Sequence, residues 1–178
     1  MKILVCIKQV PDMESKFKLN GEGNWYEGSD LAWRMNEYDE YAVEQAVQLK
    51  EQAGDADLTV LSVGPDRVKE MVKKALAMGC DRGAHVADDD SFKKDPYEIA
   101  SVIAEFAKDK GFDLIFTGMQ SQDRGSGQVG VLVAEMRPTR CARCSRVAGG
   151  QFLTVWNWGR WAPGSGIYRL GQDELDRR

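Results

Sequence analysis

Short apolar runs alternate with longer amphipathic segments along most of the chain. The apolar runs lie at 2–9, 58–63, 83–87 and 114–117, and their nearly continuous apolar character is typical of parallel strands covered on both faces. Between them, apolar residues recur at helical spacing over about 37–52, after Asp66 and after Asp95. This alternation predicts an α/β fold with three layers, in which helices cover both faces of a parallel sheet through right-handed crossovers.

Residues that favour helix starts precede the predicted helices. Asn36 stands at the N-cap position of the first, Asp66 at that of the second, and Asp95 with Pro96 at that of the third. A weaker polar–apolar alternation over 16–25, around Asn20-Gly21, predicts a short hairpin excursion before the first helix.

A glycine-rich loop follows the fourth strand and precedes another apolar segment with helical spacing. Gly125, Gly127 and Gly130 would let the backbone approach a ligand closely. The free N–H groups at the start of the next helix would then favour a phosphate. These glycines do not form a dinucleotide-binding fingerprint. That fingerprint follows the first strand and has an acidic residue about 20 positions later, whereas the glycines here follow the fourth strand and have no such residue. A loop without any ligand remains the alternative.

The predicted topology brings the ends of three strands to one crevice. In parallel sheets, ligands bind beyond the carboxyl ends of the strands, where the strand order reverses. The residues expected there are Ile7 and Lys8, Val63 and Gly64, and Thr117 and Gly118.

Composition excludes several classes of protein. The 178 residues carry a formal net charge of −4, which favours neither a nucleic-acid nor an anionic-membrane partner. No apolar run approaches the roughly 20 residues of a membrane span. The four cysteines are irregularly placed and fit a reducing compartment better than a disulfide framework. The N-terminal residues do not resemble a signal or transit peptide, so we expect a cytoplasmic, bacterial or archaeal location.

Residue usage changes near Met136. Residues 1–136 carry 16 Lys and Arg and 25 acidic residues, whereas 137–178 carry 8 Arg, no Lys, 3 acidic residues and three of the five Trp. This change predicts a boundary near Met136. An α/β domain over 1–136, whose glycine-rich loop we expect to make it adenine-nucleotide-binding, would be followed by an aberrant, irregular Arg- and Trp-rich tail over 137–178.

Several motifs in order, MKILVCIKQVPD, MNEYDEYAVEQAVQLKE, LSVGP, KKALAMGCDRG and GMQSQDRGSGQVG, resemble the β subunit of electron transfer flavoprotein over about residues 1–136. The resemblance implies a Rossmann-like fold of the adenine nucleotide alpha hydrolase-like kind. It also implies a heterodimer with an α subunit that carries most of the FAD. Such heterodimers shuttle electrons from flavoprotein dehydrogenases, including the acyl-CoA type of fatty acid β-oxidation, to a quinone reductase or other acceptor. No substrate chemistry of the chain's own is expected.

The resemblance also implies a buried AMP in this subunit, or a second FAD in its place in electron-bifurcating members. The residues that match the family's nucleotide contacts are Cys6, Asn36, Glu37, Tyr38, Asp39, Val63, Asp123, Ser126, Gly127, Gln128, Val129 and Gly130. Bifurcating members have a more acidic, Thr-containing loop, so the Arg124-Gly125-Ser126-Gly127 sequence favours AMP.

After Met136 the chain departs from the family, apart from the fragment VAGGQFLTV. We interpret 137–146 and 156–178 as products of a disrupted reading frame. The chain would then lack the last strand of the family's sheet, and the sheet would have an unpaired edge. A truncated, non-functional product therefore remains an alternative. A second is an ATP-binding enzyme of the universal-stress or adenylating kind, although neither a Walker motif nor a pyrophosphatase-type Ser-Gly-Gly loop is present.

Other reactive residues are better explained structurally. Cys141 and Cys144 have no second Cys pair or nearby His to complete a metal site. His85 lacks a nucleophile partner and is expected to be a structural histidine. The Asp88–Asp90 run lacks an EF-hand pattern and is expected to be a solvated loop.

Overall fold

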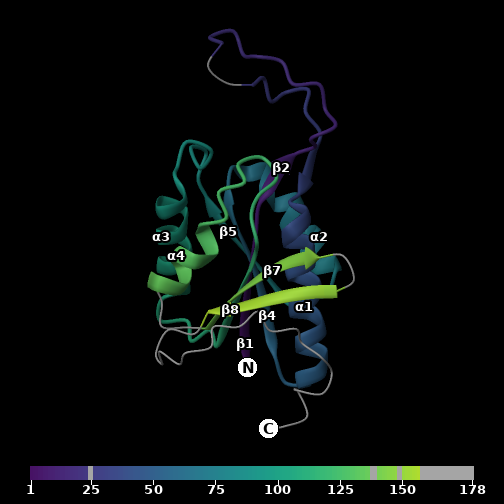
Figure 1. The fold of residues 1–178 in the computed structure, drawn as a ribbon, viewed down its shortest axis with the longest axis vertical. Helices are drawn as coiled ribbons and strands as arrows, with labels where there is room; N and C mark the ends of the chain where they lie inside the picture. The colour runs from purple at the N-terminus through teal and green to yellow at the C-terminus, as the bar shows by residue number, and fades with distance from the viewer. Residues whose placement is uncertain (24–25, 137–139, 148–149, 157–178) are drawn as a thin grey trace.

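The computed structural model describes residues 1–23, 26–136, 140–147 and 150–156 (Figure 1). The strands are β1 Lys2–Ile7, β2 Gln9–Pro11, β3 Trp33–Met35, β4 Asp57–Gly64, β5 Arg82–Ala87, β6 Leu114–Gly118, β7 Arg140–Val147 and β8 Gly150–Trp156. The α-helices are α1 Glu37–Ala53, α2 Lys69–Ala77, α3 Pro96–Ala107 and α4 Val129–Met136, and a 3₁₀ turn, η1, spans Asp66–Val68.

The central sheet has the strand order β5-β4-β1-β6-β7-β8, and only β8 runs antiparallel to its neighbour. Strand β1 lies between β4 and β6, so that Ile3 is in register with Leu58 on one side and with Leu114 on the other. The order of the chain reverses at β1, which makes its carboxyl end the topological switch point. The predicted α/β class with a mostly parallel sheet is confirmed.

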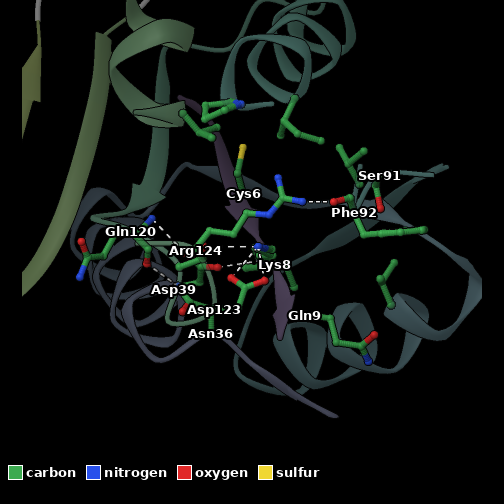
Figure 2. Close-up of a pocket in the computed structure, with 18 of the residues that line it drawn as sticks. Cys6, Lys8, Gln9, Asn36, Asp39, Ser91, Phe92, Gln120, Asp123 and Arg124 are labelled. Carbon is green, nitrogen blue, oxygen red and sulfur yellow. Dashed lines mark hydrogen bonds and ion pairs between the residues drawn. The ribbon is translucent and has the colours of Figure 1, made fainter. Parts of the chain in front are cut away.

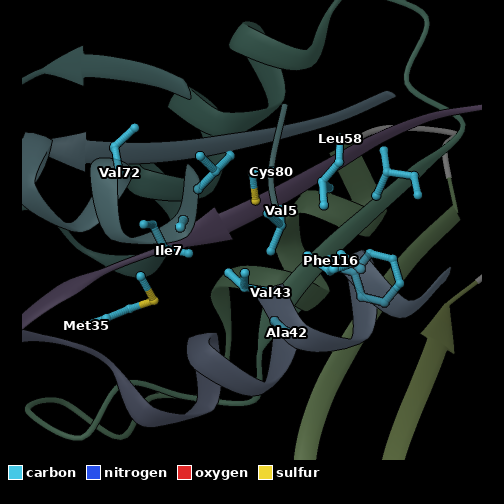
Figure 3. Close-up of a cluster of buried hydrophobic side chains, with 14 residues drawn as sticks. Val5, Ile7, Met35, Ala42, Val43, Leu58, Val72, Cys80 and Phe116 are labelled. Atoms are coloured by element: carbon cyan, nitrogen blue, oxygen red, sulfur yellow. The ribbon is translucent and has the colours of Figure 1, made fainter. Parts of the chain in front are cut away.

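Helices cover both faces of this sheet because the side chains of β1 alternate between them. Ile3, Val5 and Ile7 pack with α1 and α2 in one buried cluster, which Figure 3 shows. Leu4 and Cys6 point to the opposite face and pack with α3 and α4 in the second cluster. From Ile3 to Ile7 both faces of β1 are thus apolar and buried, in agreement with the continuous apolar run in the sequence.

Helix α3 begins as the sequence predicts. The Glu98 backbone N–H donates to Asp95 Oδ1 at 2.8 Å, and the Asp95 backbone N–H donates to Glu98 Oε2 at 2.9 Å. These reciprocal bonds form a capping box, with Pro96 in the first turn.

Asp66 does not cap α2 as predicted. It lies inside the η1 turn, and α2 begins three residues later, at Lys69. The Asp66 carboxylate instead pairs with the Lys69 ammonium at 2.7 Å. Pro65, in an extended conformation, separates the end of β4 at Gly64 from this 3₁₀ turn.

A short antiparallel ribbon between β2 and β3 was not predicted. The intervening segment extends away from the carboxyl end of the sheet (Figure 1) and contains an antiparallel bridge between Leu19 and Tyr26. That bridge and the turn bond from Gly23 N–H to the Asn20 carbonyl (3.0 Å) agree with the predicted excursion around Asn20-Gly21.

The chain after Met136 differs from the expected irregular tail. Strand β7 pairs with β6 in parallel, and β8 pairs with β7 in antiparallel. The expected open edge beside β6 is therefore covered, since β7 satisfies the backbone N–H and C=O groups on that side of β6. Residues 140–156 thus extend the central sheet, apart from 148–149, which lie outside the described residues together with 137–139 and 157–178. The disrupted reading frame stays a prediction.

Candidate functional site

A cleft lies at the carboxyl ends of β1, β4 and β6, over the switch point of the sheet. Its walls come from these strand ends, from η1, and from the loops that follow β5 and β6. Figure 2 shows Cys6, Lys8 and Asp123 converging on it. Its volume of about 180 Å³ is several times the roughly 30 Å³ that one water molecule takes up in the liquid. The cleft is therefore large enough for a small organic ligand.

Asp39, in the first turn of α1, joins two strands beneath the cleft. Its buried carboxylate accepts the Lys8 backbone N–H at 2.7 Å and the Gly118 backbone N–H at 3.1 Å. Burial raises the pKa of Asp39 to about 7, although the hydrogen bonds from Lys8, Asn36 and Gly118 lower it. One carboxylate thus connects the residue after β1 to the last residue of β6, just beyond the backbone pairing of these strands.

Asn36 occupies the N-cap position of α1, but its side chain does not cap the helix. Its Nδ2 donates to the Gln120 carbonyl at 2.8 Å, and its Oδ1 accepts the Gln122 backbone N–H at 3.0 Å. Gln122 Nε2 also donates to Glu37 Oε2 at 2.8 Å. The predicted helix start is confirmed, since α1 begins at Glu37 with Asn36 at the N-cap position. The expected capping bond is absent, because the NH₂ and the carbonyl oxygen of the buried Asn36 side chain both bond to the loop after β6.

The loop after β6 needs glycine at two positions for backbone conformation, and the first turn of α4 needs it at one for space. Gly125 and Gly127 both have φ of +62°, which disfavours residues with a Cβ. Gly130 is required for space, because a Cβ there would lie 2.3 Å from Thr117 Oγ1. The start of α4 can therefore approach the end of β6 closely.

Two cations approach the cleft floor. Lys8 Nζ lies 2.6 Å and 2.7 Å from the two carboxylate oxygens of Asp123. Burial is the largest single effect and raises the pKa of Asp123. The charge and hydrogen bond of the Lys8 ammonium, with the hydrogen bonds from Ser121 and from the backbone of Asp123, together bring that pKa below its usual value. Arg67, on η1, stacks over Trp33 with 4.0 Å between the guanidinium carbon and the ring centroid.

The structure brings together most of the residues named from the sequence. Those that line the cleft are Cys6, Asn36, Asp39, Val63, Asp123, Gly127, Val129 and Gly130. Glu37, Tyr38, Ser126 and Gln128 are not among the lining residues. Glu37 is half-buried and bonded to Gln122 and to the Tyr41 hydroxyl, so it supports the loop from behind. Nucleotide binding by any of these residues stays a prediction.

Sequence reasoning missed part of the cleft. Lys8 and Thr117 were expected at the crevice as strand ends, but not as site residues. Arg67, Trp33 and Arg124 also line it. Arg67 lies three positions after Gly64, the last residue of β4. Its closeness to a predicted strand end is the sequence signal that could have identified it as a cleft residue. Trp33 and Arg124 reach the cleft through contacts that no local pattern encodes.

The remaining candidates have structural explanations. His85 Nε2 lies 2.7 Å from the Gly64 carbonyl, which agrees with a structural histidine. Burial raises the pKa of the Cys80 thiol to about 11. No group of three His, Cys, Asp or Glu side chains within the described residues could hold a metal ion. The side chains of Cys141 and Cys144 lie outside that description.

The fold and the cleft define a Rossmann-like α/β domain with a ligand-sized cleft at its switch point. A sequence model of the family described as "Electron transfer flavoprotein domain" matches residues 25–143, more than half of the chain. The chain therefore belongs to the electron transfer flavoprotein domain family. No helix within the described ranges is long and apolar enough to cross a membrane.

Similar proteins are β subunits of electron transfer flavoproteins. The Methylophilus methylotrophus subunit is 36% identical over 135 residues, which cover 75% of this chain and 51% of the relative. The Bacillus subtilis (strain 168) subunit is 37% identical over 142 residues, covering 79% and 54%. The Syntrophomonas wolfei subunit is 39% identical over 136 residues, covering 76% and 52%. The chain thus spans about half the length of the curated relatives it matches.

Proposed function

We propose that this chain acts as a β subunit of an electron transfer flavoprotein, with AMP in the cleft at its switch point. The similarity to β subunits supports an electron-transfer role. The composition of the cleft supports nucleotide binding. A glycine-rich loop at the start of α4 lines it together with the cations Lys8, Arg67 and Arg124. A phosphate is the ligand group that such a helix start and such cations favour.

Within this proposal, each part of the cleft has a distinct role. The backbone around Gly127, Val129 and Gly130, which line the cleft, holds the phosphate. Cys6 and Val63 contact the adenine from the ends of β1 and β4, and the segment Asn36–Asp39 supports the ribose side. Asp123 serves the ribose or the loop, since an ionised carboxylate cannot donate a hydrogen bond to phosphate.

The nucleotide in this proposal is structural and not a substrate. It stabilises the folded chain because it binds the folded state and not the unfolded state. The partner is an α subunit that carries most of the FAD. The heterodimer receives electrons from flavoprotein dehydrogenases, including those of fatty acid β-oxidation, and passes them to a quinone reductase or another acceptor in the cytoplasm.

The test is to co-express the full chain with the α subunit of the same organism, to purify the complex, and to denature it with acid. Mass spectrometry of the supernatant is expected to detect AMP in a 1:1 ratio to the chain, and an absorbance scan is expected to show one FAD per complex. Two FAD per complex without AMP would indicate a bifurcating type. Steady ATP consumption by the purified chain would replace the proposal with an ATP-using enzyme of the same fold class.

A further inference from the structure

Arg124 connects the two loops that form opposite sides of the cleft mouth. It belongs to the loop after β6, and its Nη1 donates to the Lys94 carbonyl, in the loop after β5, at 2.6 Å. Its Nη2 donates to the Phe92 carbonyl of the same loop. Figure 2 shows the Arg124 side chain extended across the cleft toward Phe92. Arg124, Phe92 and Lys94 all line the cleft.

This connection spans the two strands at the centre of the site. In the order β5-β4-β1-β6, the strands β4 and β1 lie between the two loops. Neighbouring strands are about 4.8 Å apart, so the ends of β5 and β6 are separated by roughly 14 Å. The Arg124 side chain therefore lies over the ends of β1 and β4, which form the cleft floor.

The chemistry of the contact suits a reversible closure. A guanidinium group is a planar fork of donors that can bond two carbonyl oxygens at once. The acceptors here are neutral carbonyls, so the positive charge of Arg124 is not cancelled by them. Arg124 is exposed, which means that water can replace its two bonds when the mouth opens.

We propose that Arg124 is a clasp that holds the cleft mouth closed and thereby sets how long an anionic ligand stays bound. It is a positioning residue for the two loops, and its charge favours a ligand that carries phosphate at the mouth. The identity of that ligand rests on the proposed function, but the clasp itself does not.

The first test follows hydrogen–deuterium exchange in the full chain without added nucleotide. The Arg124→Ala variant is expected to raise the exchange rates about three-fold or more in both loops, 88–95 and 121–128. Lys93→Ala is the matched control, because it removes a neighbouring cation that forms an ion pair with Asp90, inside its own loop. This control is expected to leave 121–128 unchanged. Faster exchange in Arg124→Ala confined to 121–128 would overturn the clasp.

The second test measures release of AMP from the purified full chain during dialysis, by mass spectrometry of the retained protein. Arg124→Ala is expected to shorten the retention half-time about ten-fold, while Lys93→Ala keeps it within two-fold of the parent chain. Equal half-times in Arg124→Ala and the parent chain would overturn the proposed control of ligand retention. If the parent chain retains no AMP, the proposed function fails, and the exchange experiment alone decides the clasp.

Discussion

The backbone N–H of Gly118 donates a hydrogen bond of 3.1 Å to the carboxylate of Asp39, which lies 79 positions earlier in the chain. The same carboxylate accepts the Lys8 N–H at 2.7 Å. Because Lys8 follows β1 and Gly118 ends β6, this side chain bonds to the backbone just where the pairing of the two strands stops, at the cleft floor.

We expect Asp39→Asn to lower the free energy of unfolding by about 1–3 kcal/mol, since an amide NH₂ would face a backbone donor and leave it unpartnered. Urea denaturation at pH 4, where the buried Asp39 is protonated, measures this change. Glu40→Gln, one position along α1, is the matched control: Glu40 pairs with Lys74 at the surface, and its loss is expected to cost less than about 1 kcal/mol. Equal effects of the two variants would contradict the role assigned to Asp39.

The raised pKa of Asp39 predicts a pH dependence of opposite sign to that of most carboxylates. Burial raises this pKa from 3.8 to about 7, so the folded chain binds more protons than the unfolded chain between these values. The stabilising contribution of protonated Asp39 is fully present below pH 4 and is lost as the pH rises to about 7. The loss is on the order of 1 kcal/mol per pH unit.

The measurement is the midpoint of urea unfolding at several pH values between 4 and 8. Asp39→Asn is expected to remove the fall in stability between pH 4 and 7. Asp81 acts in a different window: its hydrogen bond from the Lys50 ammonium lowers the pKa below 3.8, so its contribution is lost only as the pH falls below about 4. A slope that persists unchanged in Asp39→Asn would assign the titration to another group.

The close approach of α4 to β6 predicts a coupling between Gly130 and Thr117. Gly130→Ala places a Cβ 2.3 Å from Thr117 Oγ1 and is expected to cost about 1–3 kcal/mol of stability through overpacking. Thr117→Ala removes that oxygen, which is buried without a hydrogen-bond partner among the described residues.

The double variant is therefore expected to recover at least half of the loss caused by Gly130→Ala, and a double-mutant cycle from thermal unfolding measures the coupling. Gly21→Ala is a control for the glycine substitution, because no atom lies within 4 Å of a Cβ built there. Additive effects of the two substitutions would show that the contact does not limit the packing of α4.

The capping box of α3 gives a prediction that is independent of the cleft floor. Asp95→Ala removes the acceptor for the Glu98 N–H and is expected to cost about 1 kcal/mol. Asp95→Asn keeps an acceptor oxygen and is expected to cost less than half as much. Thermal unfolding of both variants checks this order, and equal losses would indicate that charge and not the cap stabilises the helix start.

Elements with local signals were predictable from the sequence. The Asp95-Pro96 pair marks the start of α3 because both residues act on the first turn of the same helix. The apolar run of β1 identifies a central strand because both its faces are buried. Likewise, glycines after β6 indicated a tight loop, and two of them have positive φ.

Elements that depend on distant partners were not predictable. Asn36 has the composition of a helix cap, yet its side chain bonds to Gln120 and Gln122, more than 80 positions later. The β2/β3 ribbon joins segments on either side of a long excursion. The contacts of Arg124 could not be predicted from neighbouring residues, because its acceptors are backbone carbonyls 30 and 32 positions earlier in the chain. Neither did the change in residue usage after Met136 indicate that β7 would pair with β6.

The central place of β1 has a consequence for how the chain acquires its shape during synthesis. Its first residues leave the ribosome early, but one of its two neighbours, β6, begins 112 positions after Lys2. Closing so long a segment of chain costs entropy before any contact stabilises it, which slows folding. The nascent chain can therefore bind a ligand in this cleft only after the β6 loop has emerged, and the exposed edge of β1 is open to chaperones or to misassembly until then.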